Sequence, residues 1–107
     1  MAIGRKGDDA MSESFTYILL CADGSLYTGW TTDVPARLAA HNSGRGAKYT
    51  RGRLPVTLYY CERHGTREAA MSREWHLKRL SREQKLGLRG SESDISESFK
   101  NGVADNE

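Results

Sequence analysis

Three short apolar runs, each bounded by turn-forming residues, stand out along the first two thirds of the chain. Runs of this length that are rich in aliphatic and aromatic residues predict β-strands, here over residues 14–22, 26–31 and 56–63. In the first run both alternating sets of side chains are largely apolar. That strand is therefore expected at the centre of its sheet.

Helix signals follow the second and third strands. A first helix starts at about residue 33 or 34 and ends near Asn42. Thr66 is a good N-cap for a second helix that runs to about Leu80, and Ser81 with Gln84 forms a capping box for a short last helix. We therefore expect an α/β domain with a small three-stranded sheet flanked by helices, in the order β-β-α-β-α-α.

The turn at Asp23-Gly24 decides which side chains of the first two strands share a face. A two-residue loop pairs residues whose numbers sum to 47, and Tyr17 and Tyr27 then lie on opposite faces. A three-residue loop from Ala22 to a left-handed Gly24 pairs residues whose numbers sum to 46 and places both tyrosines on one face. A site that uses both tyrosines needs the second register, or a bulge that restores it.

The second helix is expected to turn a mixed set of side chains toward the sheet: Ala70, Met71, Glu74, Trp75, Leu77 and Lys78. The segment Ser43 to Pro55 is glycine-rich and is predicted to be a loop. Its single aromatic residue is Tyr49, and cations flank it on both sides in the sequence: Arg45, Lys48, Arg51 and Arg53. Cations interleaved with an aromatic ring suit phosphates and a stacked base, whereas the plainer alternative is a solvated surface loop.

The length of 107 residues suits one small domain. No run approaches the roughly 18 apolar residues of a membrane helix. Because the start of the chain also lacks the apolar core of a signal peptide, a cytoplasmic location is expected. Cys21 and Cys61 are isolated in apolar runs, which favours buried thiols over a metal site.

The charge is divided unevenly along the chain. Residues 14–90 hold 13 Lys and Arg against 6 Asp and Glu, and residues 91–107 hold 1 against 5. We expect a disordered N-terminal extension over residues 1–13, a folded domain over residues 14–90, and an acidic disordered C-terminal tail over residues 91–107. A basic domain suits a phosphate backbone or another acidic partner, although a solvated basic face has the same composition.

Several residues give the chain a resemblance to a known family. Tyr17, the word Tyr27-Thr28-Gly29 and the spacing Arg37-xxx-His41 follow the motif order of the GIY-YIG nuclease superfamily. Thr28 replaces the isoleucine of the second motif word, and the first word keeps only its tyrosine. The resemblance covers roughly residues 14–90. It is closest to small single-domain bacterial members, and the stretch is also similar to the nuclease domain of structure-specific endonuclease subunits.

The resemblance implies a role for each matched residue. Glu74 would bind a single divalent cation, Mg²⁺ or Mn²⁺, for which one carboxylate plus waters is an ordinary ligand set. Tyr17 would help deprotonate the attacking water, and Tyr27 would position water or phosphate. Arg37 would contact the scissile phosphate. His41 would act as an acid, as a base or as a phosphate donor.

Each of these residues also has a plainer interpretation. Glu74 and Lys78 are four apart and would form a surface pair on a helix, although Lys78 could instead add a phosphate contact. Both tyrosines could be core residues with hydroxyls at the sheet rim. The arginine could be an exposed helix residue, and His41 could cap the last carbonyls of its helix.

The sequence therefore predicts an endonuclease that hydrolyses phosphodiester bonds in nucleic acid, most of all DNA. Such a small domain has little means of reading bases, so strand structure is the expected target. The alternative is a nucleic-acid-binding module that uses the same basic face without cutting, and a third option is an interaction domain for an acidic protein. The resembled family has one more polar catalytic position, an asparagine in some branches, and no equivalent of it follows Glu74. Activity that is weak or depends on a partner therefore stays open. The sequence leaves the oligomeric state open as well.

Overall fold

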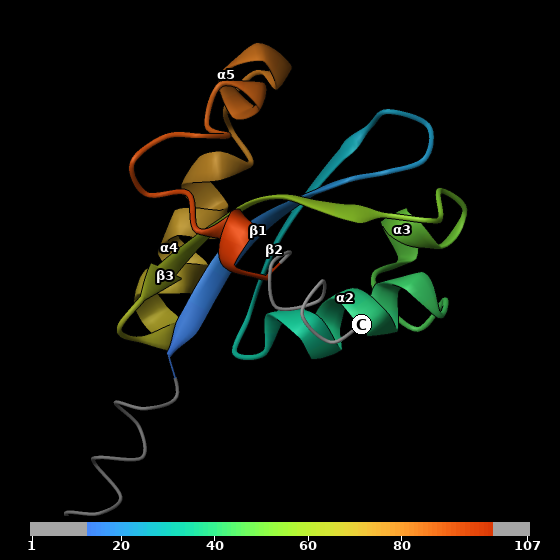
Figure 1. Ribbon diagram of the computed structural model, residues 1–107, viewed down its shortest axis with the longest axis horizontal. Helices are drawn as coiled ribbons and strands as arrows, with labels where there is room; N and C mark the ends of the chain where they lie inside the picture. The colour runs from blue at the N-terminus through green and yellow to red at the C-terminus, as the bar shows by residue number, and fades with distance from the viewer. Residues whose placement is uncertain (1–12, 100–107) are drawn as a thin grey trace, which may run out of the picture.

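The computed structural model describes residues 13–99 (Figure 1). Besides a helical stretch at residues 96–99, that part of the chain forms three strands and four helices. In chain order they are β1 (Ser14–Leu20), β2 (Leu26–Thr31), α2 (Val34–Asn42), α3 (Lys48–Arg51), β3 (Thr57–His64), α4 (Arg67–Leu77) and α5 (Arg82–Leu86). The predicted order of elements is confirmed, with the one-turn helix α3 in addition. Residues 1–12 of the expected extension and residues 100–107 of the expected tail lie outside the described residues.

The strands form an antiparallel sheet in the order β2-β1-β3, with β1 at its centre as predicted. Tyr17 lies opposite Gly29, and Leu19 lies opposite Tyr27. The loop that joins β1 to β2 closes through a hydrogen bond from the Cys21 N–H to the Ser25 carbonyl of 2.9 Å, and Gly24 adopts the left-handed φ of 86°. The three-residue loop is therefore correct, and both tyrosines share one face of the sheet.

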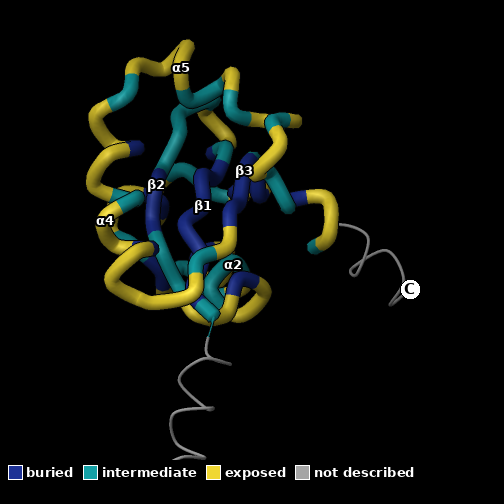
Figure 2. The backbone as a smooth tube through the Cα atoms, turned by 90° about the vertical axis from the view of Figure 1, so that its left-hand side faces the viewer, coloured by how far each residue is buried: buried dark blue, intermediate teal, exposed yellow. Residues whose placement is uncertain are grey.

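Each face of the sheet carries its own apolar cluster, and α2 and α4 lie on opposite sides (Figure 1). On the face of the two tyrosines, Val34 and Leu38 of α2 pack against β1 and β3. On the other face, Ile18 and Tyr60 pack against Leu77 at the end of α4. Figure 2 shows the strands largely buried and the outer turns of α4 and α5 exposed.

The segment 91–99 differs from the predicted disordered tail. Residues 96–99 are helical, and Ile95 and Phe99 pack against the core on the α2 side of the sheet. The Ile95 N–H donates to the Cys61 carbonyl at 2.8 Å, and the Cys61 N–H donates to the Asp94 carboxylate at 3.3 Å. The reason is that β3 is an edge strand whose outer backbone groups need partners. Ile95 and Phe99, four residues apart, supply enough apolar packing to order the segment although its overall composition is acidic.

Three further expectations, all about residues 43–80, are wrong. The segment Ser43 to Pro55 is not all loop, because α3 forms around the buried Thr50. The helix α4 ends at Leu77 rather than Leu80, and it turns Met71 and Trp75 outward, with 46% and 53% of each residue exposed. The helix packs on the sheet through the small Ala70, whose carbonyl accepts a 2.8 Å hydrogen bond from the Thr16 hydroxyl. This close approach sets which side of α4 faces inward. None of the helices in residues 13–99 is long and apolar enough to cross a membrane.

Candidate active site

The centre of the candidate site is a hydrogen bond between two buried side chains. Tyr17 of β1 is 2% exposed, His41 of α2 is fully buried, and the Tyr17 hydroxyl lies 3.1 Å from His41 Nε2. The second ring nitrogen, His41 Nδ1, lies 2.9 Å from the Thr50 hydroxyl of α3. Because both ring nitrogens have buried partners, the imidazole does not cap the carbonyls at the end of its helix.

The direction of this chain of hydrogen bonds follows from its last member. The Thr50 hydroxyl donates its only proton to the Ala47 carbonyl at 2.9 Å. It therefore accepts from His41 Nδ1–H, which leaves Nε2 as the acceptor for the Tyr17 hydroxyl. The Ala47 N–H also points at Nδ1, from 3.4 Å, and would donate to it in the other tautomer. We assign the proton to Nδ1 because the Thr50 contact is the shorter of the two, at 2.9 Å. In this tautomer, Nε2 of His41 is placed to receive a proton from Tyr17.

Two glycines are needed for the close packing around this pair. A Cβ at Gly29 would lie 2.6 Å from the Tyr17 hydroxyl oxygen. The glycine of the second motif word therefore makes room for Tyr17, the tyrosine of the first. A Cβ at Gly46 would lie 2.3 Å from His41 Nδ1 and 2.7 Å from His41 Cα. The connection between α2 and α3 thus rests directly on the imidazole.

Tyr27 is half-buried and extends the cluster toward the surface. Its ring lies edge-on to His41 with centroids 5.4 Å apart, and it is stacked with Tyr49 at 5.9 Å. Arg53 lies 4.0 Å from the centre of the Tyr49 ring and forms a 3.1 Å ion pair with Asp23 in the β1–β2 turn. Tyr49 and Arg53, which the sequence assigned to nucleic-acid binding, are therefore braced against the hairpin. The other cations of this segment are exposed: Arg45, Lys48 and Arg51.

The charges around Tyr17 act on its pKa in both directions. Burial raises the pKa of Tyr17 to about 12, the Arg37 guanidinium opposes this rise, and the ionisable Tyr27 and Glu74 add to it. The pKa of His41 is lowered, first by burial and then by Arg37. Arg37, Tyr27 and Glu74 come from three different elements, and all three act on the pKa of the hydroxyl that lies 3.1 Å from His41 Nε2.

Glu74 lies on α4, and its side chain is 21% exposed. One of its oxygens, Oε2, pairs with Lys78 Nζ at 3.3 Å, so the plain surface pair considered from the sequence is present. The same carboxylate also lies close enough to Tyr17 to raise its pKa. The pairing with Lys78 and the action on Tyr17 are therefore compatible.

Comparison with known proteins agrees with this geometry. The profile of the GIY-YIG catalytic domain matches residues 13–87. The chain belongs to the GIY-YIG nuclease family. A UPF0213 protein of Streptococcus sanguinis is 57% identical over 75 residues, which cover 70% of this chain and 86% of that protein.

Other relatives extend over more of the chain. A UPF0213 protein of Clostridium perfringens is 49% identical over 90 residues, covering 84% of this chain and 97% of its own length. The solution NMR structure of a UPF0213 protein of Bacillus halodurans matches with a TM-score of 0.50 and 44% identity, over 83% of this chain and 95% of that one. The GIY-YIG domain described here thus has close relatives among small proteins of the same size.

The acidic residues of this GIY-YIG domain limit what kind of metal site it can form. Among residues 13–99, no group of three or more His, Cys, Asp or Glu side chains is placed to hold a metal ion. A single carboxylate fits Mg²⁺ or Mn²⁺, which keep several waters and bind phosphate oxygens of a substrate. Glu74 is the carboxylate predicted for this role, and its charge raises the pKa of the Tyr17 hydroxyl.

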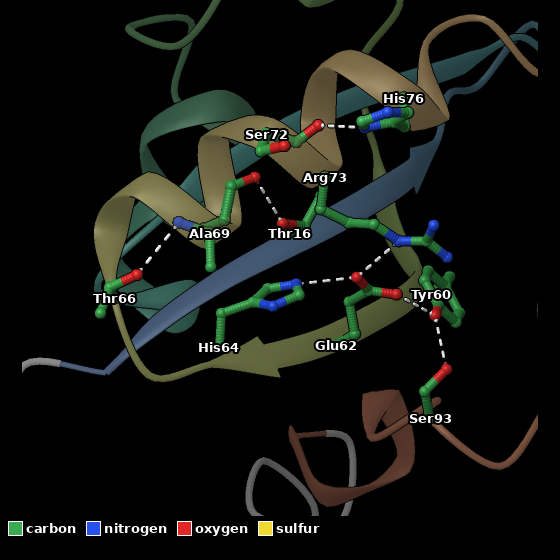
Figure 3. Close-up of polar contacts among 11 residues, drawn as sticks. Thr16, Tyr60, Glu62, His64, Thr66, Ala69, Ser72, Arg73, His76 and Ser93 are labelled. Carbon is green, nitrogen blue, oxygen red and sulfur yellow. Dashed lines mark hydrogen bonds and ion pairs between the residues drawn. The ribbon is translucent and has the colours of Figure 1, made fainter.

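A second polar cluster of the GIY-YIG domain lies around β3 and was not predicted (Figure 3). Glu62 is 5% exposed and accepts 2.8 Å hydrogen bonds from Arg73 Nε and His64 Nε2, and its other oxygen accepts from the Tyr60 hydroxyl. The Tyr60 hydroxyl also contacts Ser93, at 2.9 Å. Glu62, His64, Arg73 and Ser93 border a depression of about 420 Å³. Because the buried carboxylate is already paired, we assign the cluster to holding β3, α4 and the C-terminal segment together.

Sequence reasoning missed two polar residues that support the site. Thr50 lay in a segment predicted as loop, and no local pattern linked it to His41. Asn42 was expected only to end its helix, yet its side-chain amide bonds the Val56 backbone twice, accepting from the N–H at 2.7 Å and donating to the carbonyl at 3.0 Å. These two hydrogen bonds fix the end of α2, and therefore His41, against the residue that precedes β3.

Proposed function

We propose that this GIY-YIG domain is an endonuclease that hydrolyses phosphodiester bonds in DNA with the help of one divalent cation, Mg²⁺ or Mn²⁺. We further propose that it selects substrates by strand structure rather than by base sequence. The observation that carries the proposal is the buried chain from Tyr17 through His41 to Thr50, with Arg37 and Glu74 acting on the same hydroxyl. A protein that only bound nucleic acid would not need this buried chain of hydrogen-bonded side chains.

The two pKa values suit a proton relay at neutral pH. A tyrosine whose pKa is about 12 remains a phenol, and a histidine whose pKa is lowered remains a neutral imidazole. The Tyr17 oxygen can then take a proton from the attacking water as its own proton passes to His41 Nε2. Thr50 keeps Nδ1 protonated and oriented, so that the imidazole accepts at the correct nitrogen.

Arg37 has the geometry and charge for two tasks. It lowers the pKa of Tyr17 and so stabilises negative charge on that oxygen as the water is deprotonated. Its planar guanidinium can also hold two oxygens of the phosphate, and it stays charged throughout. Both effects favour the transition state, in which negative charge builds up on the phosphorane.

Glu74 would hold the cation. A bare carboxylate repels phosphate, so its place beside a phosphate site is explained if a cation lies between them. When bound, the cation would supply Lewis-acid stabilisation of the phosphate and of the leaving oxygen. The exposed Arg45, Lys48 and Arg51 would contact the backbone of the substrate, which makes binding salt-dependent but carries no base sequence.

The test is a cleavage assay on end-labelled DNA. Wild type and Glu74→Gln are incubated with single-stranded, duplex, forked and flapped substrates in Mg²⁺, Mn²⁺ or EDTA. We expect metal-dependent cutting that Glu74→Gln lowers by about 100-fold or more, with binding retained. Glu68→Gln, an exposed acidic residue in the first turn of the same helix, is the matched control and should cut like wild type.

The same assay separates the endonuclease from its alternative. If no substrate is cut in any metal while wild type and Glu74→Gln bind DNA equally in low salt, the domain is a binding module. Cutting that persists in EDTA would instead overturn the assigned role of Glu74.

A further inference from the structure

The outward side chains of α4 have no function in the site described so far. Met71 and Trp75 are two of the three large hydrophobic residues that are exposed within residues 13–99, and the third is Tyr49 of α3. Single exposed apolar residues are common. These two are four positions apart, so they lie side by side on one face of the helix.

Cations and a second tryptophan extend this face at both of its ends. Arg67 precedes Met71 by four residues, and its guanidinium lies 5.9 Å from the ring centre of Trp30 on the edge strand β2. At the other end, Arg79 lies 3.4 Å from the ring centre of Trp75. We call these residues the aromatic stripe: Trp30, Arg67, Met71, Trp75 and Arg79. Glu74, the proposed cation ligand, is the helical neighbour of Met71 and Trp75.

We propose that the aromatic stripe binds an unpaired DNA strand alongside the Glu74 edge of the site, with bases on the tryptophan rings and phosphates on Arg67 and Arg79. This inference rests on the proposed endonuclease function and names its substrate class. The domain would cut flaps, forks and single strands in preference to continuous duplex.

The chemistry of the stripe favours a nucleic-acid strand over a protein partner. The centre of a protein interface is depleted of charged residues, whereas here a guanidinium accompanies each tryptophan ring. Rings paired with cations match a ligand that is a polyanion with flat faces. In a duplex the base faces are covered by neighbouring bases, so a stacking platform selects unpaired nucleotides.

The dimensions of the stripe also fit a short strand. From Arg67 to Leu77 the helix is about 15 Å long, the length of four or five stacked nucleotides at about 3.4 Å each. Trp75 is half-exposed, and within residues 13–99 no other aromatic ring stacks parallel to it. Arg79 lies over one face of the indole, so a base would stack on the face that Arg79 leaves open.

The sequence supplies a direct probe of the stripe. The chain has only two tryptophans, and both belong to it. Fluorescence excited at the red edge, where tyrosine does not absorb, thus reports on the stripe alone. Wild type in EDTA is titrated with oligo(dT), with oligo(rU) and with a hairpin duplex of equal phosphate number. We expect oligo(dT) to quench the fluorescence and the duplex to leave it nearly unchanged.

Variants show whether the indole itself makes the contact. By fluorescence anisotropy of labelled oligonucleotides, Trp75→Ala should weaken oligo(dT) binding by about 5- to 100-fold, the loss of one base–aromatic stack. Trp75→Phe, which keeps a ring, should retain most of the affinity, and duplex binding should be unchanged in both. Arg79→Ala should weaken binding and reduce its salt dependence, whereas Arg82→Ala, an exposed cation of α5 off the stripe, should do so less.

The outcomes separate this inference from the function on which it rests. If metal-dependent cutting occurs but oligo(dT) does not quench, or Trp75→Ala leaves the preference for single strands unchanged, the stripe is not the binding surface. Tighter binding of oligo(rU) than of oligo(dT) would overturn the assignment to DNA. If quenching and the Trp75→Ala effect are found while no substrate is cut, the endonuclease fails and the strand-binding surface stands.

Discussion

At the scale of single residues, the tautomer of His41 depends on Thr50, which lies on a one-turn helix that no sequence pattern indicated. Thr50→Val keeps the shape of the side chain but removes the hydroxyl that accepts from His41 Nδ1. We expect catalytic turnover to fall by roughly tenfold, the effect of one lost hydrogen bond of about 1–1.5 kcal/mol. Thr50→Ser restores the hydroxyl and should recover most of the turnover.

The Thr50 prediction is measured by single-turnover cleavage together with binding affinity. A role in orienting His41 affects the chemical step and leaves binding of DNA unchanged. Thr57→Val, at an exposed threonine on β3, is the matched control. If Thr50→Val weakens binding but cuts at the wild-type rate once saturated, Thr50 does not act through His41.

The pKa shifts of Tyr17 and His41 predict how the rate of cleavage depends on pH. The relay needs His41 without its second proton and Tyr17 with its proton. The pKa of His41 lies below its usual 6.5, and that of Tyr17 is about 12. The single-turnover rate should therefore rise with pH through a midpoint below 6.5 and then stay level into the alkaline range. A rate that keeps rising tenfold per pH unit above neutrality would mean that Tyr17 reacts as a preformed phenolate.

At the scale of elements, the connection from α2 to α3 holds His41 in place. Ala at Gly46 would put a Cβ 2.7 Å from His41 Cα, a backbone atom that cannot rotate away. We expect Gly46→Ala to lower the free energy of unfolding by about 1–3 kcal/mol and to reduce cleavage. Gly52→Ala, in the same segment, meets nothing within 4 Å and should be nearly neutral. Equal urea midpoints for the two variants would show that the connection can move aside.

The elements also show what a sequence can predict. The sequence left two hairpin registers open, and the structure has the one that a site using both Tyr17 and Tyr27 requires. The caps at Thr66 and Ser81 are local signals that hold in the structure. Local rules failed where long-range contacts decide. Trp75 falls on the apolar side of a helical pattern, but the approach of Ala70 to Thr16 sets the actual orientation of α4.

The candidate site divides in the same way. Its tyrosines, Arg37, His41 and Glu74 were predicted from the family resemblance, which rests on short, local motifs. The burial of His41 between Tyr17 and Thr50 was not, since it depends on α3 packing back onto α2. Tyr49 and Arg53 were predicted to bind nucleic acid from composition alone, and their contacts with Tyr27 and Asp23 could not be predicted because they join distant parts of the chain.

At the scale of the whole molecule, the segment 91–99 closes the second edge of the sheet and completes the core beyond the end of the family match at residue 87. Phe99 meets Phe15 edge-to-face with ring centroids 5.8 Å apart. We expect Phe99→Ala and Ile95→Ala each to lower the free energy of unfolding by about 1–3 kcal/mol. The exposed Glu97→Ala should change it by less than about 0.5 kcal/mol.

Cys61 offers a chemical measurement of the same segment. The thiol is fully buried, burial raises its pKa to about 12, and its backbone is bonded to Asp94 and Ile95. It should therefore resist a thiol reagent at pH 8 in the full chain, because little thiolate forms and the reagent cannot reach it. Truncation after Gly90 should lower the urea midpoint and make Cys61 reactive. If the truncated chain keeps both the midpoint and the protection, the segment is only an attachment to the domain and the core is complete without it.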